Sequence, residues 1–344
     1  MLGGGHYKNS NQYHISKQEL WKMSKISLQS FLDTRHQKKL SYEHDIYFKA
    51  SYARLYGEVF EFEFKSKGFV FKSLGIKSKI TNTPFFDLQS PYGYSGFYAN
   101  TDDKAFLTRA LKALKEKALK EKIIAFFVRF HPFDDNLSLY ENELEFFKKD
   151  KKIVLVPLEN GITHIRSNYS PRIKSYIKKA RTEIKIQECF KDENQAFIEL
   201  YTQTMQRNKA GSFYYFDKTY FDALFDFKEY KLFKALDKEG NKAYASFFMN
   251  ENFAYYHLSA NSKHSNASAA LLDFAFEYGS SKGVKFCILG GGMQDDDSLY
   301  YFKERFSTLW TYFCIGGMIF DHNTYTNLCK NYKNSYFLAY RGGH

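Results

Sequence analysis

The sequence predicts an α/β protein made of two consecutive units of similar plan, each with helices packed around a mixed β-sheet. Three observations support this prediction. Short apolar runs rich in β-branched and aromatic residues, typical of buried strands, recur along the chain. Lysine-rich segments with helical spacing of apolar residues separate these runs. The length of 344 residues suits two domains or one large internal repeat.

Charge and cysteine usage indicate the kind of partner and the compartment. The net charge of +12 favours an anionic partner such as a phosphate, RNA or an anionic membrane face. An AT-rich genome would give the same bias toward Lys, Asn, Phe and Tyr, so both explanations stand. The four cysteines form no CxxC pair, which predicts reduced, mostly buried thiols of a cytoplasmic protein and no metal site. Neither a membrane span nor a signal peptide is expected from the apolar runs.

The first unit opens with helical and strand patterns. Residues 7–40 are polar and basic with a few apolar anchors, which predicts a helix with one docking face. Helical spacing of apolar residues continues over 45–57. Residues 58–64 then alternate as a strand, and 69–71 supply its partner across a short turn.

A tyrosine-rich loop follows over 86–96. Pro91 and two glycines predict a bent, extended segment that presents Tyr92 and Tyr94. It is either an ordinary surface turn or the lip of a pocket whose tyrosines stack on a sugar. Tyrosine clustered with glycine favours the pocket, so Tyr92 and Tyr94 are predicted to bind substrate.

The rest of the first unit reads as a lysine-rich amphipathic helix over 103–122 and buried strands over 123–130 and 153–158. His131 stands alone before a proline, and we expect a structural role for it.

The second unit begins with a basic helix that starts at Ser170-Pro171, a cap residue and a proline. One face is apolar and the rest is cationic. This cationic surface is either a solvated face or a seat for phosphates or an RNA backbone, and Arg172 and Lys178 are predicted to bind the donor. Further elements are expected in the order helix 197–205, strands 231–237, 243–249 and 253–258, helix 268–278, and strand 284–289.

A glycine turn after this last strand is the most informative stretch. Gly290, Gly291 and Gly292 let the backbone bend and approach a ligand, and they are predicted to bind the donor. Three aspartates follow, and a helix then presents Lys303 between two phenylalanines. On residue chemistry alone the stretch is either an anion site or a tight turn with a solvated lysine.

The order of these parts, Leu289-Gly-Gly-Gly292 followed by Asp297-Ser-Leu-Tyr-Tyr-Phe-Lys-Glu-Arg-Phe306, resembles the C-terminal signature of the Fem family. These are peptidoglycan aminoacyltransferases built from two GNAT (acetyltransferase-like) folds. The Pro91–Gly96 loop resembles a motif of Fem-like GNAT proteins, with Ser95 where glycine is usual. The resemblance covers roughly 42–320 and implies two tandem GNAT-like subdomains, 41–165 and 166–320, with a cleft between them. Residues 1–40 would form a helical or flexible N-terminal segment, and 321–344 would pack back on the core.

The resemblance also implies roles for single residues. Lys303 stands where the family lysine serves the acyl donor and the developing negative charge. Arg207 best matches an arginine that grips nucleotide-sugar phosphates, and Arg54 matches an N-terminal lysine that does the same. Tyr215, in the aromatic cluster after this arginine, is expected at the substrate. For the general base, Asp295, Asp296 and Asp297 are candidates by proximity in sequence.

The implied activity is transfer of an acyl or aminoacyl group to an amine of a nucleotide- or lipid-linked cell-envelope sugar or peptidoglycan precursor. No bound cofactor is expected, and the donor would be aminoacyl-tRNA or an acyl-CoA. Residues 263–268 lack the glycines with which acetyl-CoA-dependent members cradle the pyrophosphate, which favours aminoacyl-tRNA. The expected partners are therefore tRNA, the amino sugar and the inner membrane face.

Two alternatives stay open: an acetyl-CoA-dependent N-acetyltransferase of polysaccharide biosynthesis, and a non-catalytic module that binds nucleic acid or an anionic polymer. For an enzyme, we expect Arg54, the tyrosine loop and Arg207 to meet in one groove, with Lys303 across from them.

Overall fold

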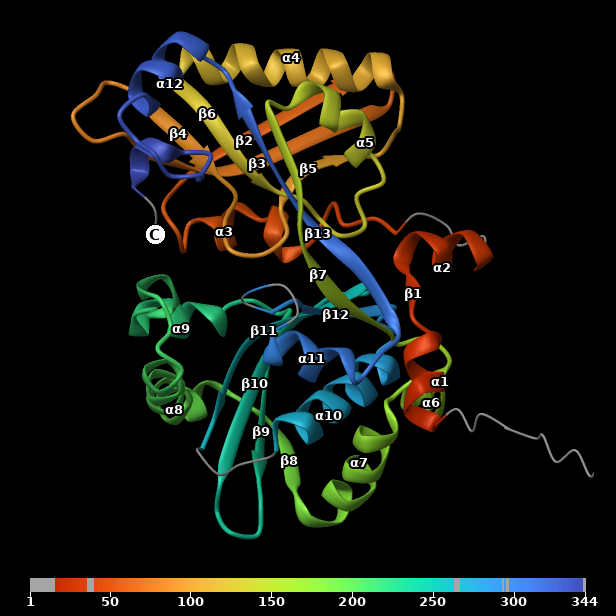
Figure 1. Ribbon diagram of the computed structural model, residues 1–344. Helices are drawn as coiled ribbons and strands as arrows, with labels where there is room; N and C mark the ends of the chain where they lie inside the picture. Colours follow the sequence, from red (N-terminus) through yellow and green to blue (C-terminus); the bar gives the residue numbers. More distant parts are fainter. Residues whose placement is uncertain (1–15, 36–39, 263–266, 293, 295–296, 343–344) are drawn as a thin grey trace, which may run out of the picture.

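The computed structural model describes residues 16–35, 40–262, 267–292, 294 and 297–342, and it confirms an α/β fold with a mixed sheet (Figure 1). The strands pair in the order β2-β3-β4-β6-β13-β7-β12-β11-β10-β9-β8, while β5 joins β3 and β1 joins β13. Their bounds are β1 Ile26–Ser27, β2 Glu58–Ser66, β3 Phe69–Lys79, β4 Phe86–Gln89, β5 Gly96–Ala99, β6 Ile123–Arg129, β7 Phe146–Pro157, β8 Lys185–Cys189, β9 Tyr230–Leu236, β10 Lys242–Met249, β11 Phe253–Asn261, β12 Phe286–Gly290 and β13 Leu309–Ile319.

The helices cover this sheet on both sides. Their bounds are α1 Lys17–Met23, α2 Leu28–Arg35, α3 Ala50–Ala53, α4 Lys104–Lys120, α5 Leu137–Tyr140, α6 Gly161–Ser167, α7 Pro171–Glu183, α8 Asn194–Arg207, α9 Lys218–Leu224, α10 Ser268–Ser281, α11 Ser298–Glu304 and α12 His322–Cys329.

Two long strands, β7 and β13, join the two halves of the molecule. β13 pairs with β6 of the first half, with Ile315 opposite Arg129, and also runs antiparallel to β7. β7 in turn pairs with β12 of the second half, with Leu155 opposite Ile288. Each half therefore lends its last strand to the sheet of the other, and the two expected sheets form one continuous hydrogen-bonded ladder.

Several elements differ from the sequence prediction. β7 begins at Phe146 rather than near 153, and β13 was not predicted. Lysines at 148, 149, 151 and 152 hide the strand pattern of β7, which pairs here with β13 and does not need an apolar run. The predicted helix within 7–40 is two short helices, α1 and α2, and residues 86–89 of the predicted loop form β4.

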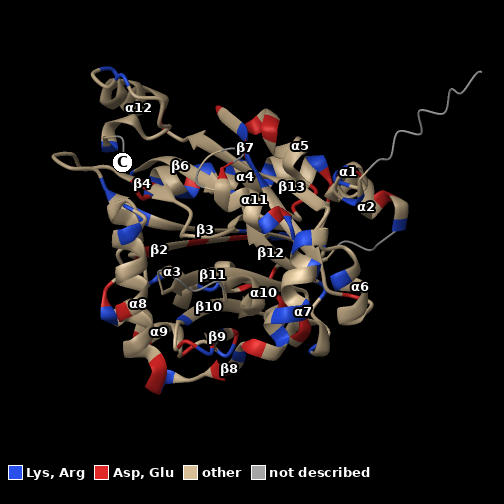
Figure 2. Ribbon diagram, turned by 60° about the horizontal axis from the view of Figure 1, so that its bottom comes forward, with Lys and Arg blue, Asp and Glu red and all other residues tan. Residues whose placement is uncertain are grey.

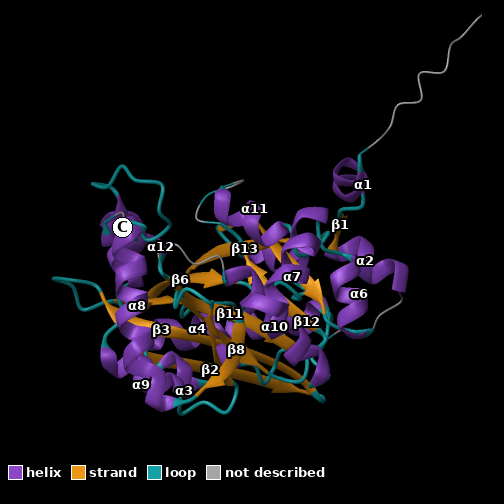
Figure 3. Ribbon diagram, turned by 90° about the horizontal axis from the view of Figure 1, so that it is seen from below, coloured by secondary structure: helices purple, strands orange, loops and turns teal. Residues whose placement is uncertain are grey.

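In the second half, two apolar clusters lie on the two faces of the sheet. Side chains of α8 and α9 pack on one face with Leu232 and Tyr244, and side chains of α6, α7, α10 and α11 pack on the other with Phe233 and Ala245. Figure 3 shows the same arrangement, with α8 and α9 on one side of the strands and α7 and α10 on the other. The alternation of neighbouring residues between the two clusters is the period of two expected of a strand.

In the first half, α4 buries its apolar stripe against the sheet, with Phe106 and Leu114 fully buried. Near the C-terminus, Leu338 packs against Ile124 on the other side of the same strands. Within the described part of the chain, no helix has the length and apolar character needed to span a membrane.

Candidate active site

The site begins where two neighbouring parallel strands part. β11 and β12 pair from Phe253 opposite Phe286 to Tyr255 opposite Ile288. Beyond this point β11 continues to Asn261 and β12 ends at Gly290, but the two are no longer paired. The backbone thus opens at the carboxyl ends of the two strands, the position at which open α/β sheets bind ligands.

Lys303 lies at this opening. Its side chain is 7% exposed, its Nζ donates a hydrogen bond of 2.7 Å to the carbonyl of Gly291, and it lies 5.6 Å from the ring centre of Tyr256. Burial lowers the pKa of Lys303 to about 8. The nearby carboxylate of Asp297 opposes this shift but does not cancel it, and Lys151 adds to it. Burying a cation is costly, and groups with pKa values lowered in this way concentrate at functional sites.

The glycine turn leaves no room for a side chain at Gly291 or Gly292. A Cβ on Gly291 would lie 2.6 Å from the carbonyl of Lys152, and one on Gly292 would lie 2.0 Å from a carboxylate oxygen of Asp297. That carboxylate caps α11 by accepting from the amide of Tyr300 at 2.8 Å. Asp297 therefore has a structural task, while the other two candidate bases, Asp295 and Asp296, lie outside the described residues.

Tyr94 of the first half reaches the same turn. Gly290 has a φ of +73°, and a Cβ built on it would lie 3.3 Å from the hydroxyl of Tyr94 and 3.6 Å from the Nζ of Lys303. The Tyr94 ring packs against Tyr255 and Phe313, which belong to the cluster on the α8 side of the sheet. Lys303 contacts Tyr256 of the opposite cluster. Tyr94 and Lys303 thus approach Gly290 from the two faces of the sheet.

A buried polar network, which the sequence did not predict, holds Tyr255, the residue on which the Tyr94 ring packs. The carboxylate of Asp45 accepts hydrogen bonds from the Tyr255 hydroxyl and the Asn250 amide. His131 Nε2 lies 2.8 Å from the Tyr255 hydroxyl, and burial lowers the pKa of this histidine. Asp45 and His131 are distant in sequence from Asn250 and Tyr255, so no local motif predicts this network. The network fixes Tyr255 and hence the wall on which Tyr94 packs.

A second chain of hydroxyls lies beneath Tyr92. The hydroxyls of Tyr56 and Tyr220 are 2.8 Å apart, and Tyr220 also lies 2.8 Å from Nε2 of His257. Burial lowers the pKa of His257 to about 3, so the ring is neutral near pH 7. The ring of Tyr92 packs on His257 and on Phe213, with centroids 5.7 and 5.8 Å away. The predicted tyrosine loop therefore bridges the two halves through aromatic contacts.

Arg129, at the end of β6, is a further residue that the sequence did not single out. It is half-buried, and its Nη1 donates to the carbonyl of Ser90 at 2.7 Å. Its charge interacts with the side chains of Tyr336, Tyr92, Tyr214 and Tyr56. No carboxylate of the described residues pairs with it. A guanidinium among hydroxyls, without an acid, has the chemistry to bind an anion.

The other predicted substrate residues make contacts that do not include Lys303. Arg207 is exposed at the end of α8 and donates through Nη2 to the backbone and side-chain oxygens of Asn261, both at 3.0 Å. Arg54 is exposed at the C-cap of α3, and Tyr215 is 44% exposed in the loop after α8. Arg207 and Lys303 come from helices on opposite faces of the sheet and contact different residues. The expected meeting of Arg207 and Lys303 across one groove stays a prediction; the residue of the first half that lies close to Lys303 is Tyr94.

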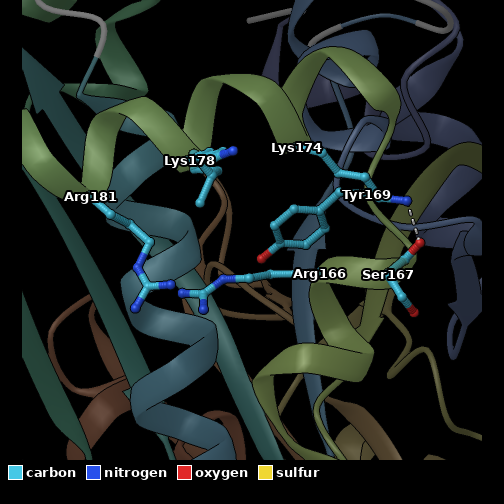
Figure 4. A pocket seen from close by; sticks show the side chains of 7 residues that line it. Arg166, Ser167, Tyr169, Lys174, Lys178 and Arg181 are labelled. Carbon is cyan, nitrogen blue, oxygen red and sulfur yellow. Dashed lines mark hydrogen bonds between the residues drawn. The ribbon is translucent and has the colours of Figure 1, made fainter.

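Arg172 and Lys178, the predicted donor-binding cations, are exposed on α7, on the same face as α11. Figure 2 shows several cationic residues along this helix. The described residues form a cavity of about 360 Å³ beside α7, lined by Lys178 but not by Arg172 (Figure 4).

Comparison with known proteins yields fold similarity only. A scan against protein-family models finds no match, and neither does a search of curated proteins. Among solved structures, the chain is similar to FemX, with a TM-score of 0.66 and 14% identity over 91% of this chain and 98% of FemX. It is also similar to L-PGS from Bacillus licheniformis, with a TM-score of 0.53 and 15% identity over 84% of this chain and 90% of that protein.

A conserved protein of unknown function from Bacteroides thetaiotaomicron VPI-5482 gives a TM-score of 0.54 and 12% identity, over 78% of this chain and 88% of that protein. The similarity to FemX extends over nearly the whole length of both chains. This chain accordingly has a Fem-like, GNAT-type α/β fold.

Proposed function

We propose that this protein is an N-acyltransferase in which the ammonium of Lys303 stabilises the oxyanion that forms when an amine attacks an activated acyl group. The observation that supports this most is the place of Lys303. It is buried, its pKa is lowered by burial despite the nearby Asp297, and it lies where β11 and β12 part. Oxyanion stabilisation by one such donor is worth about 3 kcal/mol.

The reaction forms one C–N bond and breaks one bond to the leaving group. The acceptor amine attacks the carbonyl carbon, and the carbonyl oxygen gains negative charge beside Lys303. Collapse of this intermediate expels the ester oxygen of a tRNA, or the sulfur of a CoA thioester, and the proton lost by the amine is taken up by the leaving group. The hydroxyl of Tyr94, over the same glycine as Lys303, is placed to position the acceptor amine or to bond the oxyanion.

We favour aminoacyl-tRNA as the donor and an amine of a nucleotide- or lipid-linked cell-envelope precursor as the acceptor. The fold similarity to FemX and the resemblance of the glycine-turn signature to Fem peptidoglycan aminoacyltransferases support this choice. The sequence of 263–268, without glycines, argues against an acyl-CoA. The phosphates of the acceptor would be held by Arg129, Arg207 or Arg54, and its sugar by Tyr92 or Tyr215. The net charge of +12 suits work at an anionic membrane face.

Product analysis tests this function directly. The protein is incubated with a mixture of aminoacyl-tRNAs, or with acetyl-CoA, and with candidate UDP-amino sugars or lipid-linked precursors, and the products are identified by mass spectrometry. We expect an acceptor heavier by one aminoacyl residue, formed only with aminoacyl-tRNA and lost in Lys303→Met. Acetylated product would instead establish the CoA-dependent alternative. Binding of the precursors without turnover by any donor would leave a binding module and refute the proposal.

A further inference from the structure

The cavity beside α7 is built from two helices that together present four cations. The lining residues are Arg166, Ser167, Tyr169, Lys174, Ile177, Lys178 and Arg181, which we call the α6–α7 pocket. In Figure 4 the guanidinium groups of Arg166 and Arg181 point toward one another, with the ring of Tyr169 beside them. Like charges repel, so the gathering of four cations around one cavity favours an anionic occupant.

One wall of the pocket is held rigidly. Arg166 donates to both carboxylate oxygens of Asp273 at 2.9 and 2.6 Å and to Glu277 at 2.7 Å. Tyr169 is fully buried, and its hydroxyl donates to the same Asp273 at 2.9 Å. These acids raise the pKa of Arg166, so this cation is permanently charged and fixed in place. Asp273 and Glu277 bring two negative charges to the four lining cations, so a net surplus of two positive charges remains at the pocket.

The opposite wall is a row of cations on α7. Lys174, Lys178 and Arg181 follow one another at intervals of four and three residues, so they lie along one face of the helix over roughly 10 Å. Lys174 donates to the carbonyl of Ser167 at 2.7 Å. Lys178 and Arg181 are exposed, and neither forms an ion pair with any acid in the described ranges. Two charges are therefore available to a ligand.

We propose that the α6–α7 pocket binds the phosphodiester backbone of an RNA, and that it is the docking site for the donor tRNA; this second part rests on the proposed function. A row of cations along a helix flank suits successive phosphates better than a single one, which proteins more often hold at a helix N-terminus. At the start of α7, Pro171 has no amide N–H, and the amide of Ser170 donates to the carbonyl of Arg305 at 2.8 Å, so neither residue offers a donor to an anion. The apolar lining residues, Tyr169 and Ile177, are buried, so the pocket offers no apolar group for insertion into a membrane.

Direct contacts also join the pocket to the segment that follows Lys303 in the candidate active site. Besides the bond from Ser170 to Arg305, the ring of Tyr169 packs against Phe306 at 5.3 Å, just after the helix that bears Lys303. α7 and α11 cover the same face of the sheet. An RNA bound on α7 would thus lie on the Lys303 side of the molecule.

The test is binding of fluorescein-labelled tRNA, followed by anisotropy over a series of salt concentrations. The variant is Lys178→Glu with Arg181→Glu. The control is Arg109→Glu with Lys112→Glu, which reverses one arginine and one lysine three residues apart on the exposed face of α4. We expect the α7 variant to bind about tenfold or more weakly, with a log-salt slope reduced by about 2, and the α4 control to bind like the wild type. Lys178→Gln with Arg181→Gln removes the charges without reversing them, in case the first variant fails to fold.

Wild-type affinity in both α7 variants would overturn the inference, as would equal weakening in the α4 control. The inference also fails if Lys178 and Arg181 are required for binding to phosphatidylglycerol vesicles but not for binding to tRNA. Transfer from aminoacyl-tRNA is measured in parallel. If aminoacyl transfer requires Lys303 but the affinity for tRNA is unchanged in the α7 variants, this site is refuted and the proposed function stands. Binding that needs α7 without transfer from any donor would refute the function but establish the RNA site.

Discussion

The hydroxyl of Tyr94 and the ammonium of Lys303 meet over one glycine, Gly290, although they come from different halves of the chain. A Cβ on Gly290 would lie 3.3 Å from the first and 3.6 Å from the second. This glycine therefore sets the space in which an acyl carbonyl could lie between the two groups.

Gly290→Ala is expected to abolish most transferase activity, because the added methyl occupies this space. Its φ of +73° adds backbone strain of about 1–2 kcal/mol. Gly283→Ala is a matched control, since Gly283 has a φ of +80° and no atom within 4 Å of the added Cβ. Both variants should lose similar free energy of unfolding, measured by urea denaturation, and only Gly290→Ala should lose activity. Equal activity in the two would remove Gly290 from the site.

Lys303→Met is expected to lower kcat by about a hundredfold or more and to stabilise the protein. The native pKa of about 8 lies below the ordinary value of 10.5, so the buried charge opposes folding below pH 8. At pH 7 the free energy of unfolding should rise by on the order of 1–3 kcal/mol. Lys282→Met, at an exposed lysine, is the control. A destabilised Lys303→Met protein would indicate that the lysine serves the fold rather than catalysis.

The pH dependence of kcat should report the same group. The ammonium is present below its pKa of about 8 and is lost above it, so kcat should fall as pH rises through 8. The wild-type free energy of unfolding should rise between pH 8 and 10.5 over the same titration, because the unfolded chain binds the extra proton there. In Lys303→Met, the residual activity should lack this descending limb. A limb that persists in the variant belongs to another group.

Arg129→Met is expected to raise KM for the acceptor about tenfold or more, with little change in stability. Its guanidinium has one hydrogen bond, to the carbonyl of Ser90, and no acid among the described residues. Arg341 provides the contrast, because both oxygens of Asp87 accept from it at 2.7 Å. Arg341→Met should lower the melting temperature and leave KM unchanged. If both variants act on stability alone, Arg129 has no part in acceptor binding.

The sequence determined the elements whose causes are local. The alternation in 58–64, the amphipathic pattern of 103–122 and the proline at the start of α7 each correspond to an observed element, because period and capping act within one segment. The glycine turn was also identified from sequence, since strand, glycines, cap and Lys303 follow one another directly in the chain.

The tertiary structure decided which distant side chains meet. Sheet pairing exchanges β7 and β13 between the halves, and neither strand's role is visible from its own residues, since lysines interrupt the first. The same pairing places α8 and α11 on opposite faces and brings Tyr94 of the first half to Gly290. The physical reason is that strand order and register fix the distance between segments, and these depend on the packing of the whole sheet rather than on any local stretch.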